Sequence, residues 1–510
     1  MSDRTIIDFL HEYTGKASGG RVISFHMPGH KGRASIFDKA GYSDFVRNMI
    51  TCDITEIPGA DALFCPESTL RAVMDNYADL YGAKHSELLV NGSSAGVMAA
   101  VIGTVPVGGK LILGRNSHHS AFSAMRLGAI NPVYVRPETD PYSGLVAEIS
   151  TAALKAACEE NPDADAVLIT SPNYYGMLSD ISSLAAVAHS YDMCLIVDQA
   201  HGAHLKFFDD DACRFRDDGS YVPFPYHSAE MLGADIVINS THKTLLSFTG
   251  SGVLNICSDR VDAAAVSDVL RMLQTTSPSY ILMASLDINE RIMREHGSRI
   301  ISNWRDNLAW FYAKSARITG LDVVKTRETE RALKKYPEDA AFFPMYQERA
   351  GLDMTKINIS MGGLGVSGEQ LDRELRHRGI ISEMVYGEYV MLMTGAGNTA
   401  SDYERLIEAL KAISESYGMD RTERRRPRPA ADFVLETAGV PFEAESVPLY
   451  SADGKVLYDP VIVYPPGTPI ACPGEILTLE AISYISEAIG RGEKVTGVDE
   501  EGMVRVELAH

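Results

Sequence analysis

Residues 194–204 read Cys-Leu-Ile-Val-Asp-Gln-Ala-His-Gly-Ala-His, a short apolar run that ends in a carboxylate, Asp198. A run without polar alternation is typical of a strand that is buried on both faces, as in a parallel sheet. We predict further strands of this kind at Leu88–Asn91, Lys110–Gly114, Val133–Arg136, Ala166–Ser171 and Asp235–Ser240. Because helical stretches separate these runs, the middle of the chain is predicted to form a doubly wound α/β domain.

The pattern changes past residue 300. Helical stretches at about 301–319 and 401–417 flank short strands at Lys356–Ser360 and Tyr389–Met393, which is typical of a smaller α+β domain. The sequence therefore predicts four parts: an N-terminal segment with the large domain at 1–300, the small domain at 301–420, a linker rich in Arg and Pro at 421–431, and a C-terminal domain at 432–510.

Composition and charge exclude several classes of protein. The 510 residues carry a net charge of −21, and such an acidic surface repels nucleic acid and anionic lipid. The one basic cluster, Arg421–Arg428, is short and interrupted by Pro, so a solvated linker is the better interpretation. No apolar run reaches about 18 residues, so we expect no membrane span. Seven scattered cysteines and a charged N-terminus favour a protein of the reducing cytoplasm.

The first chemical motif is Asn91-Gly-Ser-Ser-Ala-Gly96, which follows a predicted strand and begins a helix rich in Ala and Val. The free N–H groups and the positive end of such a helix favour an anion, and two hydroxyls add donors. A phosphate site is therefore one interpretation. A helix start that binds nothing is an equally good one for this motif alone.

Two further motifs end apolar strands. Asp198 and Lys243, the latter in Ser240-Thr-His-Lys243, are expected at the carboxyl edge of the sheet, where open α/β sheets bind ligands. Each could separately be a loop cap or a solvent-facing side chain. Together with the anion site they supply what pyridoxal 5′-phosphate requires: donors for its phosphate, an acid for its ring nitrogen and an amine for its aldehyde.

With these motifs the chain resembles the ornithine/lysine/arginine decarboxylases of the aspartate-aminotransferase fold, in the shorter form without an N-terminal receiver-like domain. The matching segments span nearly the whole chain: Phe25–Gly32, Asn91–Gly96, Arg115–Ser120, Asp198–His204, Ser240–Lys243, Tyr464–Ile470 and Pro473–Glu475. The resemblance implies a fold-type-I large domain with a mostly parallel seven-stranded sheet. It also implies a homodimer or higher homo-oligomer with shared active sites.

The resemblance also implies roles for single residues. Lys243 would carry the cofactor, Asp198 would pair with the pyridinium nitrogen, and His118 would stack on the ring. Lys243 or His201 would return a proton to the substrate Cα. The other implied cofactor contacts are Ser93, Ser94, Ala95, Ala200, Ser240, His242, Thr276 and Ser277, the last two on a segment that reaches the neighbouring subunit.

Three details qualify the resemblance. Gln199 stands where many relatives have Glu, and His119 stands where they have Lys, which leaves the role of that second position open. His26 and His30 have the spacing of a metal pair, but no third ligand is suitably placed, so we predict no metal. A loop near the active-site entrance is the better interpretation of that segment.

The resemblance predicts decarboxylation of a basic amino acid, arginine first, lysine next and ornithine third, in polyamine or diamine metabolism. A basic side chain needs acidic partners, and the candidates are Glu56, Asp61, Glu67 and Glu475, the last from either subunit. For each of them taken alone, a solvated surface acid is the better interpretation. The alternatives are an aminotransferase or another lyase of the same fold, and a relative without activity that binds a partner.

Overall fold

The computed structural model describes residues 6–18, 22–140, 143–208, 228–324, 351–417, 433–464 and 469–508. The predicted linker at 421–431 and its basic cluster lie outside these residues. The chain forms two compact units. The large unit draws on Ala34–Ser298, Arg349–Asp353 and Pro427–His510, and the small unit on Met1–Arg33, Arg299–Glu348 and Met354–Arg426. The described residues up to Arg33 therefore group with the small unit and not with the large domain.

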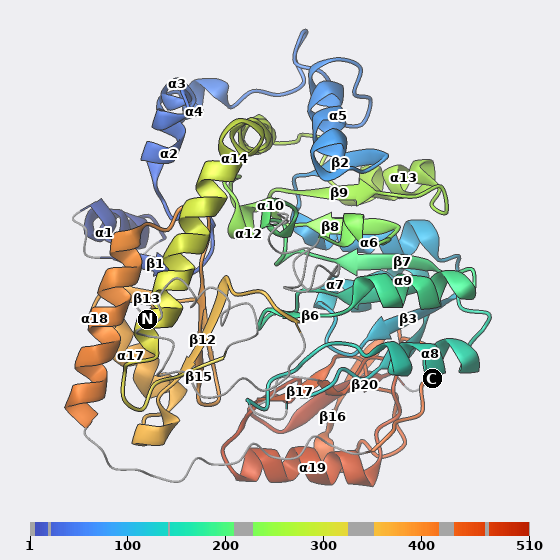
Figure 1. Ribbon diagram of the computed structural model, residues 1–510. Coiled ribbons are helices and arrows are strands. Elements are labelled where there is room, and N and C mark those ends of the chain that lie inside the picture. Colours follow the sequence, from blue (N-terminus) through green and yellow to red (C-terminus); the bar gives the residue numbers. More distant parts are fainter. Residues whose placement is uncertain are drawn as a thin grey trace, which may run out of the picture. The chain divides into compact units, whose positions relative to one another are not determined.

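A seven-stranded sheet forms the centre of the large unit, in the order β2-β9-β8-β7-β5-β3-β4 (Figure 1). Its strands are β2 His85–Leu89, β3 Lys110–Gly114, β4 Asn131–Val135, β5 Ala166–Thr170, β7 Cys194–Asp198, β8 Ile236–Asn239 and β9 Gly252–Ile256. All run parallel except β9, which is antiparallel to both of its neighbours. The predicted mostly parallel sheet is confirmed, and β9 is a strand that the sequence did not predict.

Successive strand residues point to opposite sides of the sheet, and most of these strands are largely apolar, so both faces are apolar. Helices cover each of them. On one face, strand residues such as Leu113, Leu168 and Ile196 pack against α6 Gly92–Thr104, α7 His119–Gly128 and α13 Ala263–Leu273. On the other face, strand residues such as Ile112, Val167 and Leu195 pack against α8 Thr151–Glu160 and α9 Ile181–Ser190. The side chain of Asp180 caps α9 by accepting from the Ser183 N–H at 3.1 Å.

The large unit also contains smaller elements. They are α2 Ala34–Lys39, α3 Ser43–Arg47, α4 Met49–Cys52, α5 Thr69–Tyr81, α10 Leu205–Phe208, α12 Thr241–Thr244 and the antiparallel pair β6 Met177–Leu178 with β11 Gly351–Leu352. Helix α14 spans Tyr280–Ser315 and passes from the large unit into the small one at residue 299. No helix among the described residues is long and apolar enough to cross a membrane.

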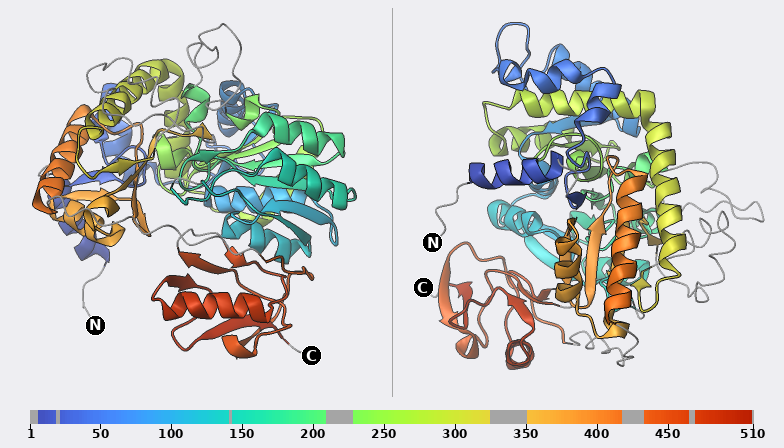
Figure 2. Two further views of the ribbon diagram at one scale, coloured as in Figure 1. Left: turned by 60° about the horizontal axis from the view of Figure 1, so that its bottom comes forward. Right: turned by 90° about the vertical axis from the view of Figure 1, so that its left-hand side faces the viewer.

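The C-terminal part of the large unit has its own hydrophobic core. Its strands are β16 Ala444–Pro448 paired with β20 Met503–Glu507, and β17 Val461–Tyr464 between β18 Pro469–Ala471 and β19 Lys494–Thr496. Helix α19, Leu479–Gly490, buries Ala481, Ile485 and Ala488 in this core, and it is clearly visible in red in Figure 2.

The small unit is built on an antiparallel sheet in the order β10-β12-β15-β14. Its elements are α1 Ile6–Ser18, β1 Ile23–Phe25, β10 Asp322–Val323, β12 Lys356–Ser360, α17 Gly368–His377, β13 Ile380–Ser382, β14 Met384–Tyr386, β15 Tyr389–Met393 and α18 Ala400–Tyr417. Strand β1 pairs in parallel with β13, which holds the N-terminal segment in this unit. The predicted strands β12 and β15 are confirmed.

Candidate active site

The predicted phosphate motif forms the turn between β2 and α6. Gly92 has a φ of +74°, which favours glycine, and its N–H donates to the Gly250 carbonyl at 2.8 Å. The next two amides of the helix, those of Ser93 and Ser94, have no acceptor inside the helix, and no side chain caps them. The Ser240 hydroxyl donates to the Ser93 hydroxyl at 2.8 Å, so two of the predicted phosphate contacts meet across 147 residues of sequence. The turn is thus a cradle of donors suited to a phosphate.

Asp198 is the last residue of β7 and is buried. The single hydrogen bond to its carboxylate from the described residues comes from the Ala200 N–H, at 3.1 Å. Burial raises the pKa of Asp198, against the opposing effects of the Lys243 ammonium and that N–H. A buried carboxylate with one hydrogen bond is costly unless it gains a cationic donor, which a pyridinium N–H would supply.

Lys243 lies in the short helix α12, directly after β8. Its Nζ is 3.1 Å from the His201 Nε2, and its charge acts on Asp198 and on His118. The amine predicted to carry the cofactor therefore contacts His201, and it lies within electrostatic range of the predicted acid and of His118. The chemistry of this donor set fits pyridoxal phosphate.

Gln199 has a structural role that explains why it need not be Glu. It is buried, and its Nε2 donates to Glu230 at 3.1 Å and to Asn239 at 3.0 Å, while its Oε1 accepts from the Ala229 N–H. This network holds the loop that follows Asp198 and leaves the acid itself unchanged. Ala200, the next predicted contact, is buried in the same loop.

His118 is the N-cap of α7, and its Nδ1 accepts from the Ser120 N–H at 3.3 Å. Burial, His119 and Lys243 together lower the pKa of His118 to about 4, so its ring is neutral at pH 7. The His119 ring lies edge-on with its centroid 4.0 Å away. The position at which relatives have Lys thus supports the ring that is expected to stack on the cofactor.

His242 and His201 complete the surroundings of Lys243. The His242 Nδ1 lies 2.5 Å from the Ser251 carbonyl and must be the donor there. Burial is the main reason why the pKa of His242 falls to about 4, with Lys243 adding to it and the Ser251 bond opposing it. His242 can donate to a phosphate only through Nε2 once protonated, which a nearby phosphate charge favours. The sequence did not predict Tyr174, whose ring centroid lies 4.6 Å from that of His201.

Thr276 and Ser277 are exposed in the loop between α13 and α14 and form no hydrogen bond or ion pair with Lys243, Asp198 or Ser93 within one chain. Their contact with a neighbouring subunit stays a prediction. His26 contacts Tyr13 and its own Met27 carbonyl, and no group of three metal-ligating side chains occurs among the described residues.

Two of the four candidate substrate acids are committed to other contacts. The Asp61 carboxylate accepts from four backbone N–H groups, those of Ala62, Glu67, Ser68 and Leu70, at 2.9–3.0 Å. Burial raises the pKa of Asp61, but these bonds outweigh it and lower the pKa to about 2.

Glu475 forms a buried bidentate ion pair with Arg115. Its expected role as a substrate contact, like that of Asp61, is therefore corrected to a structural one. Glu56 and Glu67 are exposed and stay candidates, although the Glu56 Oε1 accepts from the Leu63 N–H at 3.2 Å.

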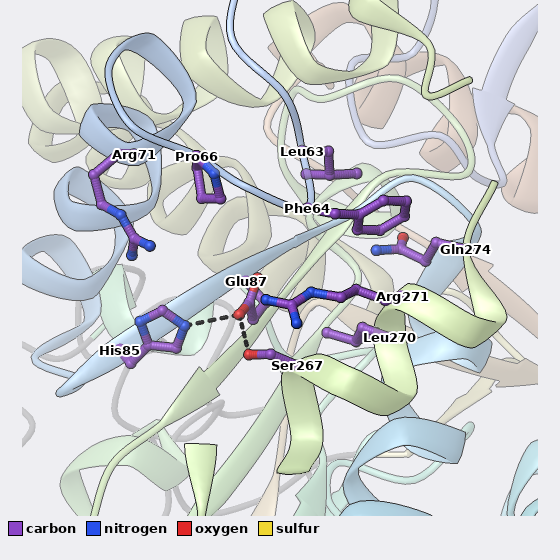
Figure 3. Close-up of a pocket in the computed structure, with 10 residues that line it drawn as sticks. All are labelled: Leu63, Phe64, Pro66, Arg71, His85, Glu87, Ser267, Leu270, Arg271 and Gln274. Atoms are coloured by element: carbon purple, nitrogen blue, oxygen red, sulfur yellow. Dashed lines mark hydrogen bonds and ion pairs between the residues drawn. The ribbon is translucent and has the colours of Figure 1, made fainter. Parts of the chain in front are cut away.

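A cavity of about 100 Å³ lies between α5, β2 and α13 (Figure 3). It is lined by Leu63, Phe64, Pro66, Arg71, His85, Glu87, Ser267, Leu270, Arg271 and Gln274. None of them is a predicted site residue. Gln274 connects this cavity to the phosphate turn, because its Oε1 accepts from the Val90 N–H at 2.7 Å. The cavity therefore lies beside Gln274, which supports the phosphate turn, and neither Lys243 nor Asp198 lines it.

Comparison with known proteins identifies the family of the chain. Residues 9–402 match the family model described as "Orn/Lys/Arg decarboxylase, major domain", and residues 430–503 match the model of its C-terminal domain. The chain is 31% identical to an arginine decarboxylase of Bacillus subtilis, over 97% of each protein. It is 30% identical to an arginine decarboxylase of Bacillus anthracis, over 94% of this chain and 92% of the relative.

Solved structures share the fold. A lysine decarboxylase of Francisella novicida superimposes with a TM-score of 0.71 at 19% identity, covering 98% of this chain and 83% of that one. The constitutive lysine decarboxylase of Escherichia coli gives a TM-score of 0.70 at 19% identity, covering 98% and 81%. The two family models together cover most of the sequence, and the chain belongs to the Orn/Lys/Arg decarboxylase family.

Proposed function

We propose that the chain uses pyridoxal phosphate, held by Lys243, to decarboxylate a basic amino acid, with arginine preferred, lysine next and ornithine third. One observation carries the proposal. The amine of Lys243, the buried acid Asp198 with its single hydrogen bond, and the donor-rich start of α6 gather at the carboxyl ends of the strands. The preference for arginine is supported by relatives that are named arginine decarboxylases and align over nearly the full chain.

Each residue has a distinct task in this proposal. Bound pyridoxal phosphate supplies the electron sink for the bond that breaks as CO₂ leaves. Asp198 keeps a proton on the ring nitrogen, because its buried carboxylate gains a cationic partner there. Lys243, or His201 at 3.1 Å from its amine, delivers a proton to the substrate Cα. The neutral His118 ring would stack on the cofactor ring.

The phosphate would be bound by the cradle of Ser93, Ser94, Ala95 and Ser240, with His242 donating after it is protonated. The substrate side chain would be bound by Glu56 or Glu67, since both carboxylates are exposed. We also propose a cytoplasmic homodimer in which Thr276 and Ser277 reach the partner's site, and a place in polyamine or diamine metabolism.

A product assay tests the proposal. Purified protein with added pyridoxal phosphate is incubated separately with arginine, lysine and ornithine, and CO₂, amine and 2-oxo acid are measured. We expect CO₂ and the matching amine, fastest with arginine, and none with Lys243→Ala. Formation of a 2-oxo acid without CO₂ would replace the proposal with its runner-up, an aminotransferase.

The arginines that an aminotransferase could use for a substrate carboxylate argue against that runner-up. In α17 the Arg376 Nε donates to Asp372 at 2.7 Å, and the Arg378 Nη1 donates to the Glu374 carbonyl at 2.9 Å. Both are held by their own helix, and the third candidate, Arg373, is exposed. Their contacts are those of a helix surface, as expected for i,i+4 pairs.

A further inference from the structure

Arg115 connects the large-domain sheet to the C-terminal domain. It follows β3 and is buried, and its Nη2 donates to the Glu475 Oε2 at 2.8 Å and to the Ile470 carbonyl at 2.9 Å. Its Nη1 pairs with the second oxygen of Glu475. The Cys472 N–H donates to Glu475 at 2.6 Å. The guanidinium and the carboxylate thus satisfy each other across 360 residues of sequence.

The turn that Arg115 begins leads directly to His118. The Arg115 N–H donates to the Val135 carbonyl at 2.9 Å, and the Ser117 N–H donates to the Gly114 carbonyl at 3.0 Å. In the same turn, the Asn116 Oδ1 and the Ser117 Oγ are buried without a hydrogen-bond partner in the described part of the chain. Side-chain anchoring of this turn therefore comes from Arg115, and so from the C-terminal domain.

We propose that the Arg115–Glu475 pair is a positioning device, through which the C-terminal domain holds the turn that presents His118 to the cofactor ring. The inference rests on the proposed function, because it takes His118 as the stacking residue. It also gives a reason for the joint presence of two distant motifs, Arg115–Ser120 and Pro473–Glu475: each contains one half of the pair.

Arg126 provides a matched control. It lies in the last turn of α7, at the end opposite His118, and it also binds the C-terminal domain. Its Nε donates to the Pro441 carbonyl at 3.0 Å, its Nη2 donates to the Tyr458 carbonyl at 2.7 Å, and its guanidinium lies 3.6 Å from the Tyr458 ring centroid. Loss of Arg126 weakens the attachment of the C-terminal domain without touching the His118 turn.

The experiment compares Glu475→Gln, Arg115→Lys and Arg126→Gln with the wild type. Apoprotein is titrated with pyridoxal phosphate and followed by absorbance and by the circular dichroism of the cofactor band, and thermal midpoints are measured without cofactor. Residues that orient a binding group change affinity by about 10- to 100-fold in metal sites. We expect about tenfold weaker cofactor binding and a reduced dichroic band for Glu475→Gln. We expect the same for Arg115→Lys, because Lys cannot form the bidentate pair.

Arg126→Gln should lower the thermal midpoint but keep the cofactor affinity and the dichroic band of the wild type. The inference is overturned if Glu475→Gln and Arg126→Gln lower the thermal midpoint alike and both variants keep the cofactor affinity and the dichroic band of the wild type.

If Glu475→Gln does not fold, the double variant Arg115→Leu/Glu475→Leu removes both charges, so that no buried charge is left unpaired. Unchanged cofactor binding in that variant also overturns the inference. A wild type that binds no pyridoxal phosphate or releases no CO₂ contradicts the proposed function itself, so the two failures are distinguishable.

Discussion

Two aspartates of the large unit show how similar side chains acquire opposite roles. Asp61, in the loop before α5, accepts four backbone N–H bonds, and its pKa falls to about 2. Asp198, at the end of β7, accepts one such bond and is buried, and its pKa is raised. The first carboxylate is satisfied by its own loop and has little left to offer a ligand. The second is underbonded and needs a cation that the protein does not fully provide.

The largest effect is expected at the amine beside Asp198. Lys243→Ala should abolish the absorption band of bound cofactor and lower turnover by more than about a thousandfold, because it removes the amine that would hold the aldehyde. Absorbance and CO₂ release measure both. Lys110→Ala is the control, since its partner is the exposed Asp163, and it should keep both properties. A Lys243→Ala protein that keeps its band would place the cofactor elsewhere.

Replacing the underbonded acid should separate function from stability. Asp198→Asn should lower turnover by about 10²- to 10⁴-fold and yet stabilise the apoprotein at pH 7. The raised pKa means that the folded protein prefers the protonated acid. The stability that Asp198 contributes to the folded apoprotein is therefore fully present below its unfolded pKa, and it is lost as the pH rises through the folded pKa. Urea unfolding of both apoproteins at pH 5 and pH 7 tests this. A less stable variant at pH 7 would contradict the account of Asp198.

The exposed acids near Asp61 should have intermediate effects. Glu67→Gln should raise KM for arginine by about tenfold with little change in kcat, because a substrate contact that acts on ground and transition states alike changes binding alone. Glu56→Gln is its matched comparison, since the Glu56 Oε1 is already used by the Leu63 N–H. Steady-state kinetics with arginine decide between them, and unchanged KM in both variants would move the substrate contact to another residue.

The smallest effect is expected at Asp61 itself. Asp61→Asn keeps a residue that tolerates its φ of +78° but removes the charge, and it should cost about 1 kcal/mol of stability with normal kinetics. Because the folded pKa is lowered to about 2, this stabilisation is present above the unfolded pKa of 3.8 and is lost as the pH falls through 2. Unfolding measured at pH 7 and pH 3 should therefore show a smaller difference at pH 3. Loss of turnover in Asp61→Asn would return Asp61 to the substrate site.

Prediction from the sequence worked where a local pattern carries the physical signal. Continuous apolar runs predict buried parallel strands, and residues at their carboxyl ends must meet at one edge, so Asp198 and Lys243 could be placed together. Strand β9 was missed because Asn255 interrupts its apolar run. The Asn255 amide is buried through bonds with Ser86 and Glu230, which no local pattern reveals.

By itself the sequence determined the α/β class, the buried strands and the chain order of the three cofactor groups, because apolar periodicity and strand ends are local properties. Tertiary structure alone decided what each acid does. Glu475 is paired with Arg115 from a distant segment, while Asp61 is bound by amides of its own loop. A carboxylate's role depends on the donors and the burial that folding brings to it, and neither can be read from its neighbours in the chain.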